Sequence, residues 1–268
     1  MRLTWTEIPT TQPLRMSNLL AFMERWRTGS TKDVRAASSE QIAALVKPLS
    51  KGRSSLPSVY LDFLETMGEH SGELRLMRGV TSASELLVDR ADLNQHHVDP
   101  NRYFKYGIGE VDYNGRQPDD FLDLTRKTPD GADAKMMRIH EERLCEGKVA
   151  PEEPFASFSD LVRAVVVMNF CLLLDPNRRP LSVGFGADVE AVKRVYEFLA
   201  KLGFELTELG ASANVIPLET PRQQAVALLR RSTTVAPLTL LMLRAPDKTE
   251  ELRLSEIISD HRAALAGA

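Results

Sequence analysis

The sequence predicts a mixed α+β protein, with helices and strands interspersed along two domains. Hydrophobic residues make up 43 % of the 268 residues and charged residues 26 %, as in globular proteins that bury a sizeable core. Apolar residues recur at helical spacing in several segments, of which 16–26 is the first. Other segments are short, rich in aromatic and aliphatic residues, and flanked by glycine, proline or asparagine, as strands are.

The first half is predicted to begin with a loosely held arm over residues 1–15. Ser38 or Ser39 is expected to cap a helix that ends at Pro48, because Gln41 stands at capping-box spacing from Ser38. Proline is tolerated in the first turn of a helix, so Pro57 fits a helix that ends at Gly68. The remaining predictions are strands at 73–77, 103–109, 120–124 and 136–140, helices at 16–26 and 81–87, a polar loop at 90–101, a hairpin turn at 112–120 and an apolar helix from Phe155.

The second half is predicted to be a smaller module after a polar turn at 175–180. Strands are expected at 181–185, 204–209, 213–218 and 238–243, and helices at 188–202, 221–231 and 253–265. Without the last helix, this order is β-α-β-β-α-β, which predicts a ferredoxin-like module.

Five short segments of the first half match the order and spacing of segments in a known protein family. They are Ser38-Ser39-Glu40-Gln41-Ile42, Leu56-Pro57 with Tyr60, Phe63, Leu64 and Gly68, the strand 103–109, Phe121-Leu122-Asp123-Leu124, and Ala156-Ser157-Phe158-Ser159-Asp160-Leu161. Over about residues 35–170 the chain resembles the SUKH (Smi/Knr-like) superfamily. It departs from that pattern in a long insertion at 90–101 and after the Phe-Leu helix, where Met67-Gly68-Glu69 replaces the expected asparagine and glycine.

The resemblance implies a twisted sheet with flanking helices in a domain that acts by binding. Bacterial members of the superfamily are often immunity proteins that neutralise toxins, many of them nucleases or deaminases. The expected organisation is an arm and helix at 1–34, a SUKH-like domain at 35–175 and the α+β module at 181–268. The expected function is immunity to a cognate toxin. The alternatives are a regulatory or scaffold role, as in the fungal relatives, and nucleotide binding by the C-terminal module.

Acidic residues concentrate between Glu110 and Asp160, where 13 acidic and 7 basic residues occur. This segment is either a solvated acidic loop or a surface for a basic partner, because complementary charge steers association. A nuclease toxin has a basic groove for phosphate, against which carboxylates would fit. The candidate toxin-binding residues are Asp112, Asp119, Asp120, Glu141, Glu142, Glu152 and Glu153. Nucleic acid is not expected as a partner, because no lysine or arginine cluster with interleaved aromatic residues is present.

No catalytic residue, metal ligand or cofactor is expected. His140-Glu141-Glu142 resembles the start of a zinc-protease helix, but Leu144 stands where the second histidine is needed. The adjacent His96 and His97 lack further ligands, and paired carboxylates such as Asp119-Asp120 are expected to be solvated. Gly184-Phe185-Gly186 begins a dinucleotide fingerprint, but Val189 replaces its third glycine.

The sequence also predicts a cytoplasmic protein with no membrane association. The N-terminus lacks the basic and then apolar pattern of a secretion signal. The longest apolar stretch, from Leu161 to Leu174, contains Arg163 and Asn169, and a spanning helix needs about 20 apolar residues. Cys145 and Cys171 are far apart in the sequence and are expected to remain thiols.

Overall fold

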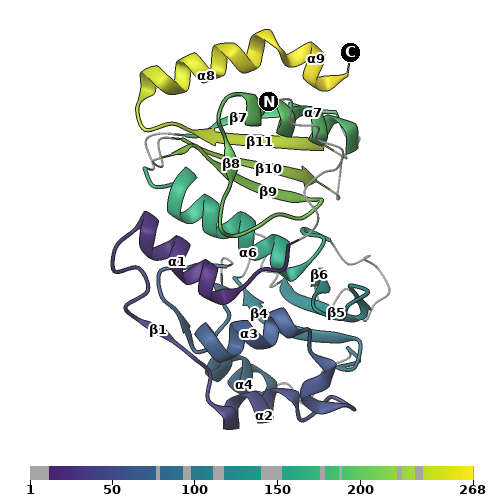
Figure 1. The fold of residues 1–268 in the computed structure, drawn as a ribbon. Helices are drawn as coiled ribbons and strands as arrows, with labels where there is room; N and C mark the ends of the chain where they lie inside the picture. Colours follow the sequence, from purple (N-terminus) through teal and green to yellow (C-terminus); the bar gives the residue numbers. More distant parts are fainter. Residues whose placement is uncertain are drawn as a thin grey trace. The chain divides into compact units, whose positions relative to one another are not determined.

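The computed structural model describes residues 12–76, 79–92, 98–110, 118–139, 153–175, 179–186, 189–221, 225–232 and 238–267. Its fold is mixed α+β, with three antiparallel sheets, which confirms the predicted class at that level. The chain forms two compact units (Figure 1). The N-terminal unit is Arg15–Val162, and the C-terminal unit joins Met1–Leu14 to Arg163–Ala268. The division falls inside the helix Phe158–Val167, earlier in the chain than the predicted domain boundary at 175–180.

The helices of the N-terminal unit largely follow the predictions. They are α1 (Met16–Trp26), α2 (Ser39–Val46), the short 3₁₀ helix η1 (Gly52–Ser55), α3 (Ser58–Met67), α4 (Ala83–Asp92) and the start of α6 (Phe158–Val167). Ser38 and Gln41 form the predicted capping box at α2, and Gly68 ends α3. Two predictions were wrong. Residues 73–76 form no strand, and Arg90 lies in the last turn of α4 and not in a loop.

The main sheet of the N-terminal unit has the order β3-β4-β5-β6, with every pair antiparallel. The strands are β3 (Gly79–Val80), β4 (Tyr103–Gly109), β5 (Asp119–Lys127) and β6 (Ala134–Ile139). A separate ribbon pairs β1 (Val34–Arg35) with β2 (His70–Ser71). Because side chains alternate between the faces of a strand, Phe104 and its cross-strand partner Leu122 share one face, and Lys105 and Phe121 share the other.

Aromatic rings from three elements form the core on the Phe104 face. The Phe158 ring centroid lies 5.1 Å from that of Tyr60, 5.4 Å from that of Phe63 and 5.4 Å from that of Tyr106, all in edge-to-face geometry. The ring centroid of Phe104 lies 5.6 Å from that of Tyr60. Edge-to-face pairs contribute about 0.5–1.5 kcal/mol beyond the burial of their area. The ring cluster therefore fixes α3, β4 and the start of α6 to one another.

A polar network around Glu69 joins three segments of this unit. The Glu69 carboxylate accepts hydrogen bonds from the Ser84 hydroxyl at 2.7 Å, the Ser84 backbone N–H at 3.2 Å and the Gln41 amide at 2.9 Å. Gln41 is also the capping-box residue of α2, and Ser84 lies in the first turn of α4. Glu69, one of the three residues at which the chain departs from the resemblance pattern, thus connects the starts of α2 and α4.

The pH dependence of stability tests this network. Burial alone would raise the pKa of Glu69, but the hydrogen bonds from Ser84 and Gln41 outweigh it and hold the pKa below its ordinary value. A depressed carboxylate pKa stabilises the fold above the unfolded-state pKa, which is about 4.3, and this stabilisation is lost as pH falls through the folded-state pKa. Urea unfolding at pH 7 and pH 4 should therefore show that Glu69→Gln destabilises the protein more at pH 7. An equal effect at both pH values would contradict this account.

The C-terminal unit contains a five-stranded antiparallel sheet with the order β7-β11-β10-β9-β8. Its strands are β7 (Leu181–Phe185), β8 (Glu205–Leu206), β9 (Val215–Glu219), β10 (Val226–Ser232) and β11 (Leu238–Arg244). Its helices are α7 (Val189–Lys201), α8 (Lys248–Asp260) and α9 (Arg262–Ala266), and the π-helical turn η2 (Met168–Leu172) follows α6.

The prediction of a helix at 221–231 was wrong, because residues 226–231 belong to the strand β10. The order of elements after β7 is therefore not the ferredoxin-like β-α-β-β-α-β. Ala227 and Leu229 of β10 belong to the hydrophobic core that contains α7, α8 and α9. Val226 and Leu228 are buried on the opposite face of the strand. A strand buried on both faces reads as a continuous apolar run, which periodicity alone cannot distinguish from a buried helix.

One face of this sheet packs against α7, α8 and α9 (Figure 1). A row of cross-strand partners, Ile216, Leu229, Leu241 and Val183, runs across β9, β10, β11 and β7 on that face. Val192, Val195 and Leu199 of α7, Leu254 and Ile258 of α8 and Leu265 of α9 complete the core. No helix in the described ranges is long and apolar enough to cross a membrane.

Arg163, which interrupts the longest apolar stretch, is a structural residue of the C-terminal unit. Its side chain is only 1 % exposed. Its Nε donates to the Leu209 carbonyl at 3.1 Å, and its Nη2 donates to the Gln12 carbonyl. The Gln12 N–H in turn donates to the Ala211 carbonyl at 2.9 Å. The described end of the predicted loose arm is therefore held by hydrogen bonds.

Candidate functional site

The structure describes three of the seven candidate toxin-binding residues, Asp119, Asp120 and Glu153. The other four, Asp112, Glu141, Glu142 and Glu152, lie outside the described residues, as does the Asn114-Gly115 turn. Asp119 and Asp120 were expected to be solvated, with Asp119 in the hairpin turn and Asp120 where that turn meets the strand 120–124; the expected solvation and the turn position of Asp119 were wrong. They are the first two residues of β5, with exposures of 7 % and 0 %. Neighbouring strands supply a cation to each, which makes their burial tolerable.

Asp119 belongs to a buried cluster of three charges. Lys105 Nζ lies 2.6 Å from Asp119 Oδ2 and 3.1 Å from Asp89 Oδ2. The other oxygen of Asp119 accepts the Gly109 N–H at 3.1 Å. Lys105 is 4 % exposed and its ammonium lies 5.6 Å from the centroid of the Phe121 ring. This cluster joins α4, β4 and β5. Asp119 therefore has a structural role in holding these elements together.

Asp120 points to the opposite face of β5 and pairs with its cross-strand neighbour Arg138. Arg138 Nε lies 2.9 Å from Asp120 Oδ1, and Nη2 lies 3.2 Å from Oδ2. Such a two-pronged contact is the strongest geometry for a guanidinium and a carboxylate. The Asp120 carboxylate is therefore also neutralised by a cation within the protein.

Glu153 is the one described candidate with a substantially exposed carboxylate. It pairs with Arg126 Nη1 at 2.7 Å and with Lys135 Nζ. Partial burial would raise the pKa of Glu153, but the hydrogen bonds from Lys135 and Arg126 hold it below its ordinary value. Glu153 therefore remains charged at neutral pH, beside two basic side chains that offset much of its field.

A pocket of about 270 Å³ lies in the N-terminal unit, on the Lys105 face of the main sheet. The rings of Tyr103 and Phe121 line it from β4 and β5. Pro48, Val98 and Pro100 give it further apolar walls. It therefore combines aromatic and aliphatic surface with two cations, Arg90 and Lys105.

The two cations of the pocket differ in their partners. Lys105 holds the carboxylates of Asp89 and Asp119. Arg90 lies over the Phe104 ring, 4.7 Å from its centroid, and its Nη1 donates to the Leu45 carbonyl. Burial lowers the pKa of Arg90, although the arginine remains cationic at neutral pH. The sequence does not reveal this pocket, because Arg90 lies in a stretch that reads as a polar loop and the uneven charge of the chain draws attention to its acidic residues.

The described residues offer little support for other chemistry. Among them, no group of three or more histidine, cysteine or carboxylate residues could hold a metal ion. Gly184 lies within β7, where an added Cβ would meet the Leu238 side chain at 3.2 Å. β7 pairs antiparallel with β11, whereas a dinucleotide fingerprint requires a parallel β-α-β unit. The glycines at 184 and 186 therefore do not lie in the parallel β-α-β unit that a dinucleotide-binding site needs.

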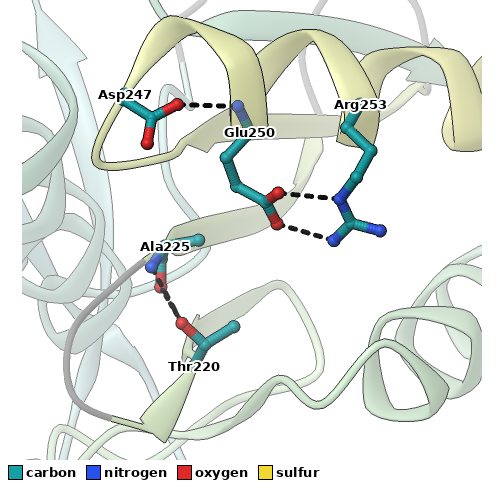
Figure 2. A network of polar contacts seen from close by, with 5 residues as sticks. All are labelled: Thr220, Ala225, Asp247, Glu250 and Arg253. Carbon is teal, nitrogen blue, oxygen red and sulfur yellow. Dashed lines mark hydrogen bonds and ion pairs between the residues drawn. The ribbon is translucent and has the colours of Figure 1, made fainter.

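An exposed polar cluster at the start of α8 is paired within itself (Figure 2). Asp247 caps the helix by accepting the Glu250 N–H at 2.8 Å. The Glu250 carboxylate accepts two hydrogen bonds from Arg253, at 2.6 and 2.7 Å. Figure 2 also shows Thr220, whose hydroxyl accepts the Ala225 N–H at 2.8 Å. These contacts stabilise a helix start and a turn, and they leave the pocket as the better candidate site.

Comparisons of the chain with models of protein families, with curated proteins and with solved structures found no match.

Proposed function

We propose that the chain is a non-catalytic, cytoplasmic immunity protein that binds and neutralises a bacterial toxin, as members of the SUKH superfamily do. The observation that carries the proposal is the position of the resemblance residues. Tyr60, Phe63 and Phe158, which come from two of its five pieces, meet in one ring cluster with Phe104 and Tyr106, which come from a third. Pieces far apart in the sequence thus form one core, as expected if they define one domain.

The burial of Asp119 and Asp120 reduces the number of acidic residues that could attract a basic toxin. Asp119 and Asp120 already neutralise Lys105 and Arg138, so they contribute little charge to an interface. An acidic toxin-binding surface would depend on Asp112, Glu141, Glu142 and Glu152, with a smaller part for Glu153. Charged groups of this kind mainly raise the rate of association.

Charge-reversal variants test whether the acidic segment, and not surface charge in general, speeds association with the toxin. The toxin candidate is the product of the gene immediately upstream, co-purified with the tagged chain. Lysine at positions 141, 142 and 152 (Glu141→Lys, Glu142→Lys, Glu152→Lys) should slow association at low salt by about tenfold or more, since steering raises rates by about 10–1,000-fold. The matched control reverses Glu40, Glu65 and Glu85, three glutamates at the surface of the same unit. An equal loss in the test and control variants would show that the acidic segment has no specific role.

Complex formation itself distinguishes immunity from the regulatory alternative. A stable complex with the upstream gene product is expected if the chain is an immunity protein. A scaffold protein would instead co-purify with other cellular proteins and leave that product unbound, which would contradict the proposal.

A further inference from the structure

We infer that a basic surface at one end of the main sheet of the N-terminal unit binds an acidic segment of a protein partner. The basic surface consists of four cations from three separate parts of the chain: Lys47, Lys51, Arg102 and Lys127. It lies at the end of β5, whereas Asp119 and Asp120 lie at its start. The inference therefore goes beyond the proposed toxin, which is expected to be basic.

Pairing and side-chain contacts bring the three parts of the chain together. β4 begins directly after Arg102 and pairs antiparallel with β5, which ends at Lys127, so both residues lie at the same end of the sheet. The Lys127 ammonium donates to the Ser55 carbonyl at the end of η1. The Ser50 N–H, in the loop between α2 and η1, donates to the Asn101 side-chain oxygen at 2.8 Å. This loop, the start of β4 and the end of β5 therefore adjoin one another.

The positive charges of the basic surface are not compensated within the fold. Lys47, Lys51 and Arg102 are exposed, and in the part of the chain that the structure describes none of them forms an ion pair. By contrast, Arg53, which stands between them in the loop, pairs with Glu65. Complementary charge steers association, so three exposed cations without carboxylate partners favour an acidic partner.

Lys127 is the cation for which a negatively charged partner is most favourable. It is half-buried, and within the described ranges its ammonium has the Ser55 carbonyl as an acceptor but no carboxylate. Burial lowers the pKa of Lys127, and the nearby charge of Lys51 lowers it further. Both effects disfavour the charged form of the lysine. A carboxylate of the partner placed between Lys51 and Lys127 would offset both of them.

Exposed carboxylates beside the basic surface favour a protein segment over a nucleic acid. Asp99 accepts the Asn101 N–H at 2.9 Å, just before β4, and Asp130 accepts the Ala132 N–H at 3.0 Å, in the turn after β5. Both aspartates are exposed. A nucleic acid has a continuous row of phosphates, which would pass close to these negative charges. A protein segment can place its glutamates and aspartates against the lysines alone.

The test is fluorescence anisotropy of the full chain with two labelled probes at low salt. One is a hexaglutamate peptide, and the other is a single-stranded DNA heptamer with the same number of negative charges. Hexaglutamate is expected to bind at least about threefold more tightly than the DNA, and its binding should weaken as salt is raised, because salt screens exposed charges. No binding of hexaglutamate, or binding of the DNA that is as tight or tighter, would overturn the inference. Because neither probe is the toxin, this result does not bear on the proposed immunity function.

Variants locate the binding on the basic surface. Lys47→Met with Lys51→Met changes two exposed side chains, so the fold should be kept, and the pair should weaken hexaglutamate binding about threefold or more. Lys127→Met alone should also weaken binding in a variant that melts as a folded protein. The matched control, Lys32→Met with Lys201→Met, removes two exposed lysines elsewhere and should bind as the parent chain does. Unchanged affinity after the loss of Lys47 and Lys51, or an equal loss in the control, would also overturn the inference.

Discussion

Lys105→Met is expected to lower the free energy of unfolding by about 3–5 kcal/mol, because it leaves two largely buried carboxylates without their cation. Lys105 is 4 % exposed and contacts both Asp89 and Asp119. Methionine has a similar length, so the loss would come mainly from the unpaired charges and less from a cavity. Urea unfolding at neutral pH measures the effect. Lys47→Met, at an exposed lysine of the same unit, should change stability by less than about 0.5 kcal/mol.

A second set of substitutions tests the charge explanation for Lys105. Adding Asp89→Asn and Asp119→Asn to Lys105→Met removes both negative charges and keeps the shapes of the side chains. Much of the lost stability should return, because replacing all members of a buried ion cluster is far less harmful than removing one. If the triple variant were as unstable as Lys105→Met, packing and not charge would explain the loss.

Phe158→Ala is expected to lower the free energy of unfolding by about 3–5 kcal/mol, since it opens a cavity among Tyr60, Phe63 and Tyr106. Phe158 is fully buried in the described structure. Thermal and urea unfolding measure the loss. Phe158→Leu keeps most of the volume and should cost about 1.5 kcal/mol or less. Equal losses in the two variants would mean that the rings do not form the tightly packed core described above.

Local signals in the sequence predicted the helices of the first half well. The apolar spacing of 16–26 gave the bounds of α1, and the Ser38–Gln41 pair gave the start of α2. Capping and periodicity depend on residues a few positions apart, so one sequence contains what they need. The burial of β10 on both faces depends on distant elements, and its apolar run was mistaken for a helix.

The candidate site could not be predicted in the same way. Asp119 looked like a surface residue because its partner, Lys105, lies on another strand and its second neighbour, Asp89, on a helix. The pocket arises from the meeting of α4, β4 and β5 with Pro48, Val98 and Pro100. A charge count reports the amount of charge in a segment but not which charges the fold pairs. The register of β4 and β5 would have been needed to predict those pairs.

The central claim, that the chain neutralises a toxin by binding it, is tested most directly by growth. The upstream gene product is expressed in bacteria alone, with this chain, and with Phe158→Ala as a destabilised control. The account predicts that the product alone stops growth, that the intact chain restores it, and that Phe158→Ala restores it less. Growth that is unaffected by the upstream product, or that this chain does not rescue, would contradict the claim.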